Sequence, residues 1–257
     1  RKESAMQEMT SDTLKKKTEG LATEAFLSHC YNHFGDQLVL ASSLGAEDQV
    51  LTHMALKIDP KARVFVLDTG RLNQETYTVM NETMNTYHMR YEVCFPDPES
   101  VTEMVQEKGP NLFYESIENR KQCCHVRKVA PLKEKLKTAK AWITGLRRQQ
   151  SVTRQQLERV EWDDGNQLIK LNPLADWTED QIWDYIKTHK IPYNSLHDQG
   201  YPSIGCAPCT RAIKPGEDVR AGRWWWETPE QKECGLHMVD GKLVPIRDQD
   251  NDKGQNE

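Results

Sequence analysis

The chain has 257 residues, a formal net charge of -5 at neutral pH and 28% charged residues. An acidic balance argues against general nucleic-acid binding, and no apolar run reaches the roughly 18 residues that a membrane-spanning helix needs. The length allows one large α/β domain or two small ones. Seven cysteines without a secretory signal pattern predict a reducing, cytoplasmic setting.

Strand and helix patterns alternate along the first 150 residues. Each short apolar run is bounded by turn residues and most are followed by a helical segment, which predicts a parallel sheet with helices on both faces. The predicted strands and helices are, in chain order, 38–41, 47–57, 64–67, 73–87, 91–94 and 141–144. Beyond residue 160 the pattern changes, because Thr178-Glu179-Asp180-Gln181 predicts a capped helix and 192–222 is rich in proline and glycine.

Three polar loops follow predicted strands: Ser42 to Asp48, Asp68-Thr69-Gly70, and Gly145-Leu146-Arg147-Arg148. Ligands of open α/β sheets bind at the carboxyl ends of the strands, so we expect these loops to converge there. In the first loop, hydroxyl groups and the N–H groups of a helix N-terminus can hold an anion. Taken alone, a tight turn with N-caps explains that loop equally well.

Basic residues are concentrated between Arg120 and Arg154, where Glu134 is the one acidic residue. Part of this segment is expected to be the solvated face of a helix. The pairs Arg127-Lys128 and Arg147-Arg148 lie beside cysteines or a glycine turn, so they are better candidates for binding an anion. Together with the first loop, they favour an anionic nucleotide as the ligand.

Four cysteines, the adjacent Cys123 and Cys124 with the pair Cys206 and Cys209, have the makings of a metal site. Four thiolates can hold tetrahedral zinc or a 4Fe–4S cluster. Neighbouring side chains diverge by about 100° on a helix, which suits the separate corners of a cluster better than one zinc ion. An odd cysteine count counts against a disulfide framework. Unrelated structural cysteines remain the alternative.

A fifth cysteine, Cys234, has the surroundings of a nucleophile. His237 follows it by three residues, and Arg220 and Arg223 precede it by a short segment. Nearby cations lower the pKa of a thiol and so favour the reactive thiolate. The alternative is an unreactive cysteine near the end of the chain.

Taken together, these segments resemble the thioredoxin-dependent adenylyl-sulfate (APS) reductases, within the phosphoadenylyl-sulfate (PAPS) reductase family. The resemblance extends from about residue 38 to residue 237. The segments that carry it are Leu67-Asp68-Thr69-Gly70, Cys123-Cys124-His125-Val126-Arg127-Lys128, Gly145-Leu146-Arg147-Arg148-Gln149-Gln150-Ser151, Tyr201-Pro202-Ser203-Ile204-Gly205-Cys206, Arg220-Ala221-Gly222-Arg223-Trp224 and Glu233-Cys234-Gly235-Leu236-His237.

The resemblance implies an adenine-nucleotide α-hydrolase-like α/β fold and a 4Fe–4S cluster. The implied reaction converts adenosine 5′-phosphosulfate to sulfite and AMP. In it, the Cys234 thiolate attacks the sulfuryl group, and thioredoxin resolves the resulting S-sulfonate. The implied organisation is a nucleotide domain at 12–215, a mobile catalytic segment at 216–237 and a polar tail at 238–257. A homo-oligomer is also expected.

The family's site residues map onto specific positions of this sequence. The catalytic residues would be Cys234, Lys128 and His237. Phosphosulfate-binding cations would be Lys128, Arg220 and Arg223, and a loop carrying Arg147 and Arg154 would close over the nucleotide. The full set implied to bind substrate is Ser42, Ser43, Leu67, Gly145, Arg147, Arg154, Arg220 and Arg223. Lys128 follows Cys124 by about one helical turn, so one helix could serve both the cluster and the substrate.

Three other functions stay open. A PAPS reductase or an enzyme with dual use is the nearest, although that branch typically lacks the cluster cysteines. An adenylyl-transferring ATP pyrophosphatase is a second, but the Ser42 to Asp48 loop lacks the Ser-Gly-Gly-x-Asp-Ser arrangement. A non-catalytic iron–sulfur redox sensor is the third, and in such a protein Cys234 would be dispensable.

Overall fold

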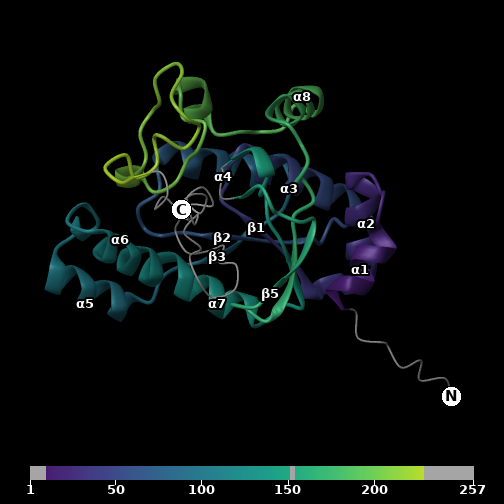
Figure 1. The fold of residues 1–257 in the computed structure, drawn as a ribbon, viewed down its shortest axis with the longest axis horizontal. Helices are drawn as coiled ribbons and strands as arrows, with labels where there is room; N and C mark the ends of the chain where they lie inside the picture. The colour runs from purple at the N-terminus through teal and green to yellow at the C-terminus, as the bar shows by residue number, and fades with distance from the viewer. Residues whose placement is uncertain (1–9, 151–153, 229–257) are drawn as a thin grey trace, which may run out of the picture.

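The computed structural model describes residues 10–150 and 154–228, which form a sheet flanked by helices (Figure 1). Within these residues the sheet has six strands in the order β3-β2-β1-β4-β6-β5. Neighbouring strands are parallel, except that β5 pairs antiparallel with β6. The strands are β1 (Leu38–Ser42), β2 (Arg63–Leu67), β3 (Glu92–Cys94), β4 (Ala141–Ile143), β5 (Val160–Asp163) and β6 (Leu168–Leu171).

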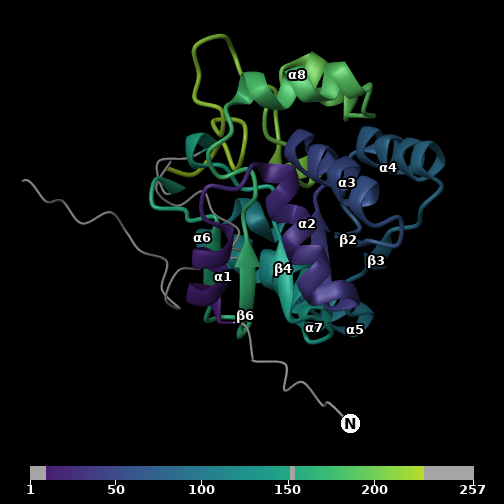
Figure 2. The same ribbon diagram turned by 90° about the vertical axis from the view of Figure 1, so that its right-hand side faces the viewer.

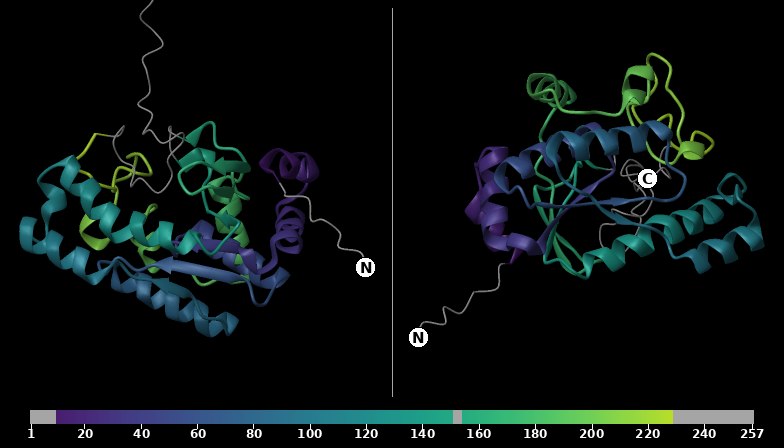
Figure 3. Two further views of the ribbon diagram at one scale, coloured as in Figure 1. Left: turned by 90° about the horizontal axis from the view of Figure 1, so that it is seen from below. Right: turned by 180° about the vertical axis from the view of Figure 1, so that it is seen from behind.

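The helices cover both faces of this sheet. They are α1 (Ser11–Thr18), α2 (Thr23–Phe34), α3 (Ala46–Ile58), α4 (Gln74–Tyr87), α5 (Pro98–Lys108), α6 (Ile117–Cys124), α7 (Ala130–Leu136) and α8 (Glu179–His189). Figure 2 shows α2 and α3 side by side on one face, and seen from behind in Figure 3 the continuous rod of α6 and α7 lies on the other. No α-helix in 10–150 or 154–228 is both long and apolar enough to cross a bilayer.

The sheet has an apolar core on each face, and the side chains of β1 point alternately into one and the other, as strand geometry requires. Leu38 and Leu40 pack into the larger core, which also contains residues of α2, α3, α4 and α8. Val39 points the other way, into a smaller core that it shares with Leu132 and Leu136 of α7. Burial on both faces explains why the strands read as continuous apolar runs rather than alternating ones.

The predicted α/β architecture is therefore confirmed, including the four strands and the helices predicted at 47–57 and 73–87, which are α3 and α4. The helix predicted to begin at 178–181 is also confirmed as α8, where Thr178 and Gln181 form a complete capping box. The antiparallel β5–β6 hairpin was not predicted. The domain boundaries at residues 215 and 237 stay a prediction, and residue 237 lies outside the described residues.

The strand order reverses direction between β1 and β4, which are adjacent in the sheet although α3, α4 and much of the chain separate them. In open α/β sheets, a crevice for ligands forms at the carboxyl ends of the strands at such a switch point. The loops after Ser42 and after Ile143 leave the sheet at this point, and a third loop leaves β2 beside them.

Candidate active site

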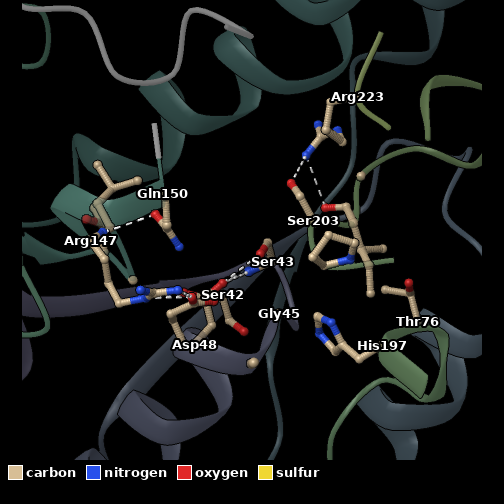
Figure 4. A pocket seen from close by; sticks show the side chains of 18 of the residues that line it. Ser42, Ser43, Gly45, Asp48, Thr76, Arg147, Gln150, His197, Ser203 and Arg223 are labelled. Carbon is tan, nitrogen blue, oxygen red and sulfur yellow. Dashed lines mark hydrogen bonds and ion pairs between the residues drawn. The ribbon is translucent and has the colours of Figure 1, made fainter. Parts of the chain in front are cut away.

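One cavity of about 670 Å³ opens at the carboxyl ends of β1, β2 and β4 (Figure 4). The three polar loops all line it, so their predicted convergence is confirmed. Nine of the predicted site residues line this cavity, namely Ser42, Ser43, Leu67, Lys128, Gly145, Arg147, Arg154, Arg220 and Arg223. Cys234 and His237 lie outside the described residues. The geometry therefore brings the described part of the predicted site together, while the role of each residue stays a prediction.

The loop after β1 is held by hydrogen bonds to its own helix. Asp48 accepts from the Ser43 backbone N–H at 2.6 Å and from the Ser43 hydroxyl at 2.7 Å. Leu44 has a left-handed φ of 63°, and its N–H donates to the Ser42 hydroxyl at 3.1 Å. Burial raises the pKa of Asp48 to about 6, against the opposing effect of the Ser43 bonds. The loop leads directly into α3, whose N-terminus faces the cavity with N–H groups suited to an anion.

The loop after β4 approaches the loop after β1 so closely that only glycine fits at residue 145. A Cβ atom there would lie 2.2 Å from Asp48 Oδ1 and 3.0 Å from Glu47 Cβ. Contacts this short require the backbone or the acidic side chains to shift, because neither neighbour is the far end of a long flexible chain.

Replacing Gly145 with alanine is expected to weaken nucleotide binding about tenfold, because it would push the two loops apart by a fraction of an ångström or more. Isothermal titration calorimetry with AMP measures the dissociation constant of each variant. Gly165→Ala is the matched control, since a Cβ there meets only Asp163 Oδ1 at 3.4 Å. Equal affinity in Gly145→Ala and the wild type would contradict this reading of the loop contact.

Arg147 is held in place by an acidic partner from α3. Its Nε donates to Glu47 Oε1 at 2.8 Å, and its Nη2 lies 2.7 Å from the same oxygen. The side chain is only 6% exposed. Gln150 Oε1 accepts from the Arg147 backbone N–H at 3.0 Å and from Arg154 Nη1 at 2.6 Å. Both arginines that the resemblance assigns to a nucleotide loop are therefore fixed by one glutamine.

Arg223 lies at the opposite wall of the cavity. Its Nη1 donates to Ser203 Oγ at 3.2 Å and to the Ile204 carbonyl at 3.3 Å, and its guanidinium stacks on the Trp224 ring at 4.7 Å. A Cβ at Gly205 would lie 2.4 Å from the guanidinium, so glycine makes room for it. The cavity thus has cationic side chains on both walls.

The four predicted cysteine ligands line a second, smaller cavity. They pack in one apolar cluster with Phe113 and Trp224, and none of the four forms a disulfide with another described cysteine. Cys124, Cys206 and Cys209 are buried. Among the described residues, no three His, Cys, Asp or Glu side chains are arranged to grip a single metal ion. Four thiols around one apolar cavity nonetheless form the donor set that an iron–sulfur cluster takes.

Among these four thiols, Cys206 has a distinct electrostatic environment. Burial disfavours its thiolate, but the charge of Lys128 and a hydrogen bond with Thr69 outweigh burial and lower the pKa of Cys206. Thr69 Oγ1 lies 3.2 Å from the Cys206 sulfur. Burial raises the pKa of Cys209 to about 12, with a further contribution from the nearby Cys206 thiolate. Cys206 therefore supplies a thiolate ligand more readily than Cys123 or Cys209, because burial raises the pKa of both of those thiols.

Lys128 joins the two cavities, because it lines both of them. It lies in η3, a π-helical turn (His125–Val129) that connects α6 with α7. π-Turns within helices occur frequently at functional sites. The predicted placement of the cysteine pair and a basic residue on one helical rod is observed. The sequence did not reveal the π-turn itself.

The sequence model of one protein family, the phosphoadenosine phosphosulfate reductase domain, matches residues 37–212, which is more than half of the chain. The chain belongs to this family. It is also 51% identical over 229 residues to an adenosine 5′-phosphosulfate reductase of Allochromatium vinosum, covering 89% of this chain and 88% of that protein. The predicted family of reductases is therefore confirmed.

Solved structures agree with the family assignment. The PAPS reductase of Candida auris, solved as a phosphate complex, superposes with a TM-score of 0.68 and 26% identity, covering 79% of this chain and 96% of that one. Yeast FAD synthetase superposes with a TM-score of 0.53 at 13% identity, covering 80% of this chain and 70% of that one, and shows a shared fold alone. The predicted adenine-nucleotide α-hydrolase-like fold is confirmed.

Proposed function

We propose that the chain reduces adenosine 5′-phosphosulfate to sulfite and AMP, with a protein dithiol of the thioredoxin type as reductant. The main support is that nine residues predicted for substrate binding and catalysis line one cavity beside four clustered cysteines. A relative covering most of the chain is named as a reductase of this substrate. The cavity is large enough for a nucleotide, since ligand pockets commonly measure about 300 to 1,000 Å³.

The proposed chemistry proceeds through Cys234. Its thiolate attacks the sulfuryl sulfur, forming an S–S bond while the sulfur–oxygen bond to AMP breaks and the phosphate leaves with the electron pair. A thiolate of the reductant then attacks Cys234 sulfur and expels sulfite. The second thiol of the reductant resolves the mixed disulfide, so the dithiol supplies both electrons and ends as a disulfide.

Cations are needed because a thiolate must approach an anionic phosphosulfate. Lys128, Arg220 and Arg223 line the cavity and would neutralise the charge that develops on the leaving phosphate. Arg147 is already paired with Glu47, so it would orient the nucleotide with little net charge of its own. The Ser42 hydroxyl and the N–H groups at the start of α3 would donate hydrogen bonds to its phosphate, and Ser43, whose own donors bind Asp48, would line this end of the site.

A 4Fe–4S cluster held by Cys123, Cys124, Cys206 and Cys209 would be the cofactor. In this proposal the cluster supplies a fixed charge beside the substrate site and passes no electrons to the substrate. Lys128 would experience that charge directly, because it lines both the cysteine cavity and the nucleotide cavity. The fold would thus hold the Lys128 ammonium group between the cluster and the nucleotide.

The test is an anaerobic assay of the purified protein with reduced thioredoxin and, in separate reactions, APS, PAPS or ATP. Sulfite and AMP formed from APS, with a much lower kcat/KM for PAPS, is the expected result. A preference for PAPS would favour the activity named for the Candida auris structure. AMP formed from ATP without sulfite, or no product from any nucleotide, would contradict the proposal.

A further inference from the structure

Asp48 lies where the two loops at the switch point meet. It accepts two hydrogen bonds from Ser43, at 2.6 and 2.7 Å, and a further backbone hydrogen bond from Gly145. The residue is only 7% exposed, on the first turn of α3. One carboxylate therefore holds the loop after β1 and the loop after β4 together, and Figure 4 shows its bonds to Ser43.

The loop that Asp48 holds contains a strained residue. Leu44 is buried and adopts a φ of 63°, a left-handed conformation that costs energy for a residue with a Cβ. Such conformations persist where the surroundings fix them, and they are common at ligand-binding sites. Here the bonds from Ser43 to Asp48 fix the residue just before Leu44, and the Ser42 hydroxyl fixes the Leu44 N–H.

We propose that Asp48 is a positioning residue whose charged form holds both loops in the arrangement that binds the phosphate end of the nucleotide. The inference rests on the proposed function, because it assumes that the cavity binds an adenine nucleotide. Asp48 itself would not touch the ligand, since the Ser43 and Gly145 donors already occupy its carboxylate.

The charge state of Asp48 depends on its neighbours. Burial, with a smaller contribution from the charge of Glu47, raises its pKa to about 6. Glu47 is itself paired with Arg147, and Tyr91 approaches Asp48 from the side of β3. A raised carboxyl pKa means that the charged form is complete well above pH 6 and disappears as the pH falls through 6. The loops are therefore expected to loosen on acidification.

The experiment compares AMP dissociation constants of the wild type and Asp48→Asn between pH 5 and pH 8. Asparagine keeps the shape but presents an amide N–H₂ to the loop donors, so we expect binding about 10 to 100 times weaker at pH 8. The phosphate of AMP itself titrates at about pH 6. Dividing the dissociation constant of Asp48→Asn by that of the wild type at each pH removes this contribution. As Asp48 becomes protonated in the wild type, the ratio is expected to fall toward one near pH 5.

Asp59→Asn, at the other end of α3, is the matched control and should bind AMP like the wild type at every pH. Ser43→Ala is a second variant. Losing the hydroxyl removes a hydrogen bond that lowers the pKa of Asp48. As the pH falls, Ser43→Ala should therefore begin to lose affinity for AMP at a higher pH than the wild type does. A ratio near one at pH 8, or a large ratio that does not change with pH, would overturn the inference. A wild type that does not bind AMP at all would instead contradict the proposed function.

Discussion

Replacing Cys206 with serine is expected to remove the iron and sulfide of the proposed cluster and to abolish sulfite production. Cys206 combines burial with a thiol pKa that the charge of Lys128 and a hydrogen bond with Thr69 lower, so its thiolate forms more readily than that of an ordinary buried cysteine. A serine hydroxyl does not ionise there and is a poor ligand for iron. Iron and acid-labile sulfide, measured on anaerobically purified protein together with the visible absorbance, report the loss.

Cys94→Ser provides the control for this change. Cys94 is half-buried at the end of β3 and does not line the cysteine cavity, so this variant should keep its iron and its activity. Full iron content in Cys206→Ser, with an unchanged absorbance spectrum, would contradict the ligand assignment. Iron loss in both variants would indicate a general effect on folding, which circular dichroism would detect.

Replacing Lys128 with alanine is expected to lower kcat/KM for APS by about 10² to 10³, because a preorganised cation beside the leaving phosphate is removed. Lys128 lines both cavities but is not one of the four proposed cluster ligands, and Arg127 and Arg223 also lower the pKa of Cys206, so the iron content and the cluster absorbance should persist. Lys128→Arg keeps the charge and should recover part of the loss. Steady-state kinetics with parallel spectra provide the measurement.

Lys121→Ala is the matched control, since this exposed lysine lies on α6 just before the cysteine pair. It removes the same charge from the same helical rod and should leave kcat/KM near the wild-type value. Unchanged turnover in Lys128→Ala with an intact cluster would rule out a catalytic contribution of this ammonium group. An equal loss in both lysine variants would point to the overall charge of the rod.

Much of the fold could be predicted because its signals are local. Buried parallel strands appear as short apolar runs, and the polar loops after residues 42, 67 and 143 follow directly from the strand ends. The β5–β6 hairpin was harder to predict, because Trp162 is half exposed and Lys170 is buried, so neither strand shows a simple alternation. Tertiary packing decides their burial there, which the sequence pattern does not encode.

Two features of the site gave no signal of their own in the sequence. An aspartate in the first turn of a helix is a common favourable charge, so nothing distinguished Asp48 as the contact between two loops. The π-turn before α7 coincides with Pro131, which has no N–H to donate to the Arg127 carbonyl. Proline at that position fits the start of an ordinary helix equally well. Both features depend on where distant segments pack.

In the proposed reaction, Cys234 carries the sulfur between the nucleotide and the reductant. The most direct measurement is an anaerobic incubation of the wild-type protein with APS and no reductant, followed by peptide mass spectrometry. We expect release of AMP and a sulfonate adduct on the peptide containing Cys234, which reduced thioredoxin then removes with release of sulfite. AMP and sulfite formed on addition of thioredoxin, without any preceding adduct on Cys234, would contradict it.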